Sequence, residues 1–122
     1  PVNVTTGLKG VVANGGTAEG RAVVVPMMDD HAKIAEIDAR MQKGDVLVAE
    51  STSPDIMMLC KKAVAIVADQ GGMLSHAAVV SRELGIPCIV RTERATQIIK
   101  DGDLIEVDAD KGVVRILERN HE

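Results

Sequence analysis

An uninterrupted apolar stretch, Val64 to Ala68, leads within three residues into the glycine pair Gly71-Gly72. A short run that is apolar at every position is typical of a central strand buried on both faces of a parallel sheet. The glycines permit a tight loop with open backbone N–H groups. Ser75 can then cap a helix whose first turn carries His76. A buried strand, a glycine loop and a capped helix in succession predict an α/β protein.

The start of this expected helix is a candidate phosphate site. Backbone N–H groups at a helix N-terminus bind phosphate, and they would also hold the dianion of a phosphorylated histidine. We therefore predict that His76 accepts a phosphoryl group and that the backbone of Gly71 and Gly72 approaches it closely. A plain turn is an equal alternative for the two glycines. Ser75 is either a helix cap alone or also a donor to the phosphate.

The rest of the chain alternates strand-like and helix-like segments, which supports the α/β class. We expect one domain over residues 1–122, with its core over about 7–117. The expected strands are Leu8–Ala13, Arg21–Val25, Val46–Ala49, Val64–Ala68, Ile86–Val90, Leu104–Val107 and Val113–Leu117. The expected helices run from Asp29 or Asp30 to about Gln42, from Ser53-Pro54 to Lys61-Lys62, from Ser75 to near Gly85, and from Thr92 to Lys100.

Two hydroxyl side chains are expected near the glycine loop. The strands Val46–Ala49 and Val64–Ala68 should be parallel and joined by a helical crossover. Their C-terminal ends then meet at one edge of the sheet, where open α/β sheets form binding crevices. Thr52 and Ser53 follow the first of these strands, so we expect both beside the glycine loop as phosphate-binding residues. Capping of the following helix is the alternative role for Ser53.

Composition excludes several classes of function. The chain has no Phe, Tyr or Trp, which argues against single-stranded nucleic-acid binding by base stacking, and its net charge of −4 argues against binding a phosphate backbone. No apolar run approaches the roughly 20 residues of a membrane-spanning helix. Cys60 and Cys88 both lie in apolar segments and are expected to be buried free thiols in a reducing, cytoplasmic compartment. No metal site is expected.

The segment Gly71–Val90, GGMLSHAAVVSRELGIPCIV, closely resembles the phosphohistidine motif of the phosphoenolpyruvate-utilising enzymes. That family includes phosphoenolpyruvate synthase, pyruvate phosphate dikinase and Enzyme I of the sugar phosphotransferase system. The resemblance covers most of the chain, roughly Gly7 to Leu117. Its other parts are Gly44–Ala49, Thr52-Ser53-Pro54, Asp101-Gly102-Asp103 and Val107-Asp108.

The resemblance implies a three-layer β/β/α swivelling domain in which His76 is transiently phosphorylated on Nε2. It implies that the phosphoryl group travels between a nucleotide-binding domain and a phosphoenolpyruvate/pyruvate-binding barrel, in the same or separate chains. It also places Ser53 near the histidine. No cofactor is expected in this domain, whereas Mg²⁺ and ATP or phosphoenolpyruvate are expected on the partner domains. The isolated domain is therefore not expected to be a complete enzyme.

Two other functions fit the same resemblance. One is a non-catalytic regulatory or interaction module, such as the domain appended to some pyruvate kinases. The other is the carrier domain of a phosphotransferase that acts on an antibiotic, a phenol or another acceptor. One departure bears on the choice, because many relatives have Gly-Thr where this chain has Arg91-Thr92. Arg91 either adds a cation near the phosphate or blocks a partner domain. Arg82 is expected to be a structural or docking contact.

Overall fold

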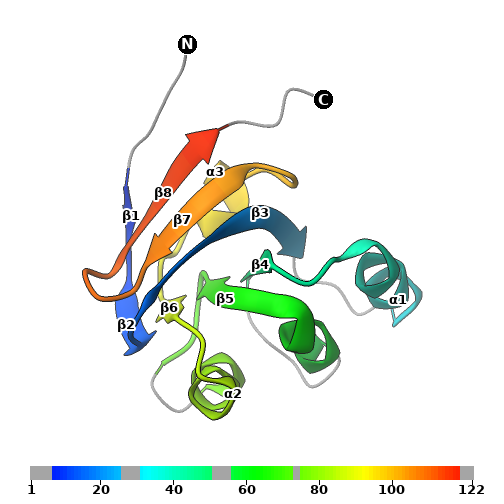
Figure 1. Cartoon of the computed structure of the whole chain (residues 1–122), viewed down its shortest axis with the longest axis horizontal. Coiled ribbons are helices and arrows are strands. Elements are labelled where there is room, and N and C mark those ends of the chain that lie inside the picture. The colour runs from blue at the N-terminus through cyan, green and yellow to red at the C-terminus, as the bar shows by residue number, and fades with distance from the viewer. Residues whose placement is uncertain (1–6, 26–30, 51–55, 73–74, 119–122) are drawn as a thin grey trace.

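The computed structural model describes residues 7–25, 31–50, 56–72 and 75–118, which form one mixed α/β sheet structure (Figure 1). The strand order is β1-β8-β7-β3-β4-β5-β6-β2. The strands are β1 (Leu8–Lys9), β2 (Val11–Asn14), β3 (Thr17–Val25), β4 (Asp45–Ala49), β5 (Ala63–Ala68), β6 (Cys88–Val90), β7 (Leu104–Asp108) and β8 (Val113–Glu118). The helices are α1 (His31–Arg40), the 3₁₀ helix η1 (Ile56–Lys62), α2 (His76–Leu84) and α3 (Ala95–Ile98).

The long strand β3 joins the two halves of the sheet. Its first part pairs antiparallel with β7, from Thr17 opposite Asp108 to Arg21 opposite Leu104. Its second part, Ala22 to Val25, pairs in parallel with β4. The sequence predicted only this second part, because Thr17 to Arg21 alternates exposed and partly exposed positions and carries no apolar run. The strand therefore begins four residues earlier than its hydrophobic pattern indicates.

The prediction of one strand over Leu8–Ala13 is wrong, because the chain divides at Gly10. Before Gly10, β1 pairs with β8, and after it β2 pairs with β6 at the opposite end of the strand order. A Cβ at Gly10 would lie 2.5 Å from the carbonyl oxygen of Val90. Only glycine allows the backbone this close approach, so it is the residue at which the chain passes between the two edges.

Side chains of the central strands alternate between two cores, which gives the three layers predicted from the resemblance. Leu47 and Ile66 belong to a core shared with α1, η1 and α2. Their neighbours Val46 and Val67 belong to a second core shared with β7, β8 and α3. Figure 1 shows α1 and α2 on one side of β4 and β5, with β7 and β8 on the other. Burial on both faces explains why these strands are apolar at consecutive positions.

Three other elements differ from their predicted form. The segment before β5 is a 3₁₀ helix over Ile56–Lys62 where an α-helix was expected. The predicted helix Thr92–Lys100 is reduced to α3, because the Thr92 side chain binds the end of β5. Strand β6 begins at Cys88, two residues later than expected. The predicted helix start at Asp29 or Asp30 lies outside the described residues.

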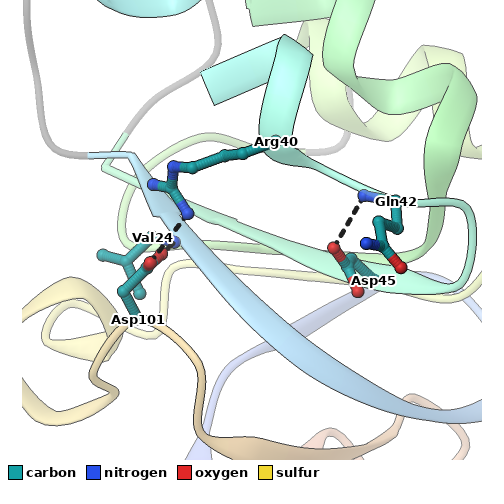
Figure 2. Close-up of polar contacts among 5 residues, drawn as sticks. All are labelled: Val24, Arg40, Gln42, Asp45 and Asp101. Carbon is teal, nitrogen blue, oxygen red and sulfur yellow. Dashed lines mark hydrogen bonds and ion pairs between the residues drawn. The ribbon is translucent and has the colours of Figure 1, made fainter. Parts of the chain in front are cut away.

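A carboxylate in the loop before β7 ties helix α1 to the sheet. The Oδ1 atom of Asp101 accepts a 2.9 Å hydrogen bond from the backbone N–H of Val24, and its Oδ2 atom lies 2.8 Å from Nη1 of Arg40 (Figure 2). At the end of α1, Asp45 accepts a 2.9 Å hydrogen bond from the backbone N–H of Gln42. These contacts hold the helical layer in place along β3 and β4.

Within the part of the chain that the structure describes, no helix is long and apolar enough to cross a membrane. Cys60 and Cys88 are both buried free thiols, as predicted.

Candidate functional site

The C-terminal ends of β3, β4 and β5 lie side by side at one edge of the sheet. The parallel pairing of β4 with β5 confirms the predicted arrangement of the two apolar strands. Their hydrogen bonding continues past the strand ends, from Asp69 N–H to Ala49 O at 3.0 Å and from Gln70 N–H to Glu50 O at 2.9 Å. The loop that contains Gly71 therefore emerges at this edge.

Ser75 is the N-cap of α2, as its position in the sequence predicted. Its backbone is extended, with φ −69° and ψ 161°, and its Oγ accepts a hydrogen bond from Ala78 N–H at 3.4 Å. The same hydroxyl donates its proton to the carbonyl oxygen of Gly72 at 2.7 Å. A phosphate could receive that proton only after the bond to Gly72 opens. The structure thus assigns Ser75 its capping role.

The two glycines of the loop differ in what their positions demand. Gly71 has a φ of +110°, and a Cβ there would lie 3.2 Å from the Oγ of Ser75. Gly72 does not have a positive φ, and a Cβ there would meet no atom of the described residues within 4 Å. The turn therefore requires glycine at position 71 but not at position 72.

His76 is the first residue of α2, and it is exposed. Neither its imidazole nor its backbone N–H forms a hydrogen bond or ion pair with the described residues. The next two residues, Ala77 and Ala78, are buried against the sheet and fix the orientation of this helical turn. The arrangement leaves the imidazole accessible at the surface, next to the positive end of the helix dipole.

The other end of α2 is tied to strand β2. The Nε atom of Arg82 donates to Ala13 O at 3.1 Å. Asn14 donates from Nδ2 to Ile86 O at 2.8 Å and to Ser81 O at 3.3 Å. Arg82 is therefore a structural contact, which is one of its two expected roles. Gly85, with φ +71°, ends the helix as predicted.

Sequence reasoning missed Asp69, the residue that directly follows β5. This residue is 5% exposed, and its Oδ1 atom accepts a hydrogen bond from Thr96 N–H at 3.0 Å. The Thr96 hydroxyl donates to its Oδ2 atom. Thr92 Oγ1 lies 3.4 Å from Oδ1, although it donates over a shorter distance, 3.0 Å, to Ala68 O. A carboxylate placed directly between an apolar strand and a glycine pair was the available signal.

The remaining sequence predictions concern hydroxyls, metals and thiols. Thr52 and Ser53 lie outside the described residues. Among the residues that are described, no group of three or more His, Cys, Asp or Glu side chains is placed to hold a metal ion.

Burial raises the pKa of both Cys60 and Cys88 to about 11. For Cys60 the charge of Cys88 adds to this effect, whereas for Cys88 a hydrogen bond with Ser81 and the charge of Arg82 oppose it.

Comparisons with known proteins agree with this geometry. Residues 41–112 match the family model described as "PEP-utilising enzyme, mobile domain". Over 107 residues the chain is 51% identical to a protein of Staphylothermus marinus and 49% identical to one of Aeropyrum pernix, named "Probable phosphoenolpyruvate synthase" and "Phosphoenolpyruvate synthase". Each match covers 88% of this chain but only 12% of the relative.

A solved structure supports the fold independently of sequence. The structure of an Enzyme I protein determined by NMR superimposes with a TM-score of 0.67 at 16% identity, over 90% of this chain and 92% of that one. At this identity the likeness establishes the fold alone. The matched family model and the synthase relatives show the family as well as the fold. The chain belongs to the mobile domain family of the phosphoenolpyruvate-utilising enzymes.

Proposed function

We propose that this domain is a phosphoryl carrier in which His76 is transiently phosphorylated. In the proposed step, the Nε2 lone pair of the neutral imidazole forms a bond to phosphorus. The bond between phosphorus and the bridging oxygen of the donor breaks, and its electron pair leaves with that oxygen. The reverse step delivers the phosphoryl group to the acceptor and restores the neutral ring.

The observation that carries the proposal is the exposure of His76 at the first position of α2. A group attached to this ring projects from the domain, where a second active site can reach it. Helix N-terminal N–H groups and the adjacent turn at Gly71-Gly72 offer donors to the phosphoryl oxygens. Thr52 and Ser53 stay predicted contributors on the grounds of sequence alone.

We propose that the donor and acceptor sites belong to partner domains. The chain spans only 12% of the synthase relatives, which leaves room in those proteins for a nucleotide-binding domain and a phosphoenolpyruvate/pyruvate-binding barrel. Mg²⁺ and ATP or phosphoenolpyruvate would be bound there. The buried free thiols support the predicted reducing, cytoplasmic compartment.

The test is phosphorylation in trans. A phosphoenolpyruvate synthase whose own carrier histidine has been replaced is incubated with this chain and phosphoenolpyruvate. Intact-mass analysis should show one added phosphoryl group that is lost in acid and retained in base, and added pyruvate should remove it. His76→Gln should stay unlabelled. Equal labelling of that variant would disprove the assignment of His76, and an unlabelled wild-type chain would favour a non-catalytic interaction module.

A further inference from the structure

The loop after β6 contains an unusual backbone conformation. Arg91 and Glu93 have φ values of 59° and 72°, and they are the two non-glycine residues with positive φ among those described. Such values are uncommon for residues with a Cβ. Between them, Thr92 is 6% exposed. The chain thus turns sharply on both sides of a buried residue and directs two charged side chains to the surface.

This loop is held to the end of β5 by its backbone and by Asp69. Thr92 N–H donates to Ala68 O at 3.1 Å, and Glu93 N–H donates to Asp69 O at 3.0 Å. The Asp69 carboxylate accepts the backbone N–H and the hydroxyl of Thr96. The loop is therefore attached to the residue that lies two positions before Gly71.

The same attachment places Arg91 and His76 at one edge of the sheet. Strands β5 and β6 are parallel, with Val67 opposite Ile89, so the chain leaves both strands in the same direction. The Cβ position of Gly71 lies 3.8 Å from Cγ1 of Val90 and 3.3 Å from Cβ of Ser75. Gly71 is thus packed between the residue before Arg91 and the residue before His76.

The Arg91 side chain is exposed and forms no hydrogen bond or ion pair with the described residues. Its guanidinium carries a permanent charge and a planar set of N–H donors that suits phosphate oxygens. We propose that Arg91 binds the phosphoryl group carried by His76. This inference rests on the proposed function. Of the two roles that the sequence left open for Arg91, the geometry favours the added cation over the obstruction of a partner.

Chemical phosphorylation separates this role from partner docking. Wild type and variants are treated with phosphoramidate, which phosphorylates accessible histidines without an enzyme, and the phosphoryl group is titrated by ³¹P NMR. A nearby cation stabilises the dianion, so Arg91→Gln should raise the phosphoryl pKa by about half a unit to one unit. Arg91→Lys should retain part of the effect, and added salt should reduce the difference between wild type and Arg91→Gln.

Arg94→Gln is the matched control, because it removes the same charge from an exposed side chain three residues along the loop. Its phosphoryl pKa should stay near that of wild type. Equal titration of Arg91→Gln and Arg94→Gln would overturn the contact. If Arg91→Gln keeps the phosphoryl pKa of wild type but is labelled faster by a synthase, Arg91 obstructs docking of a partner instead. Failure of wild-type His76 to accept phosphate from either phosphoramidate or the synthase would contradict the proposed function itself.

Discussion

The glycine pair offers a sharp test of the candidate site, because the structure separates two explanations that the sequence left equal. Gly71→Ala places a methyl group on a residue with φ +110°, where its Cβ would lie 3.2 Å from Ser75 Oγ. Gly72→Ala adds the same methyl group where no atom in the part of the chain that the structure describes lies within 4 Å. The two variants change the chain by the same atoms at adjacent positions, so each serves as the control for the other.

The two variants should differ clearly in their free energy of unfolding. A non-glycine residue in a sparsely populated backbone region costs about 1–3 kcal/mol, and the tight contact with a hydroxyl fixed by Gly72 adds to that cost. We expect Gly71→Ala to lose about 2–3 kcal/mol of unfolding free energy. Gly72→Ala should change it by less than about 0.5 kcal/mol, or stabilise slightly through the less flexible unfolded chain.

Urea denaturation followed by circular dichroism measures these changes, and the in-trans phosphorylation assay measures the function. If the phosphoryl group approaches the Gly72 backbone, Gly72→Ala should slow labelling by roughly tenfold, equivalent to about 1.4 kcal/mol, with stability unchanged. Labelling of this variant at the wild-type rate would show that the glycine pair only forms a turn and does not approach the phosphoryl group. Equal stability of the two variants would refute the backbone argument for Gly71.

Two further predictions concern the scaffold. Gly20→Ala should destabilise the domain by about 1–3 kcal/mol, because its Cβ would lie 2.3 Å from the backbone oxygen of Gly44. Urea denaturation measures this loss. The control is Glu19→Ala at the exposed neighbouring position, which should leave the free energy of unfolding nearly unchanged. Burial raises the pKa of Cys60 and of Cys88 from the ordinary 9.0 to about 11, so the protonated native thiols contribute stability below pH 9 that is lost as the pH rises toward 11. Unfolding free energies measured from pH 8 to 11 should fall over this window, and a Cys60→Ala/Cys88→Ala variant with an equally steep fall would contradict the assignment.

Local sequence signals predicted the elements whose form depends on nearby residues. Helix α2 begins after Ser75 and ends at Gly85 as expected, because a side-chain cap and a left-handed C-terminal residue act within one helical turn. The apolar runs predicted β4 and β5, because both faces of each strand are covered.

Long-range contacts explain what the sequence pattern missed. Residue spacing did not indicate that Ile56–Lys62 forms a 3₁₀ helix and not an α-helix, or that α3 is short. Thr92 reads as a helix start, yet its side chain donates to Ala68 O, 24 residues earlier. The position of Asp69 after an apolar strand was visible in the sequence, but its contacts with Thr92 and Thr96, 23 and 27 residues further along the chain, were not.

The sequence by itself determined the α/β class, the capped helix and the identity of His76 as the candidate nucleophile, because periodicity and capping chemistry are properties of consecutive residues. Only the tertiary structure decided that the chain divides at Gly10, that Gly71 and Gly72 have different requirements, and that Arg91 lies at the same edge as His76. These features depend on which strands become neighbours. That choice is made by the burial of two cores at once, to which residues distant along the chain contribute together.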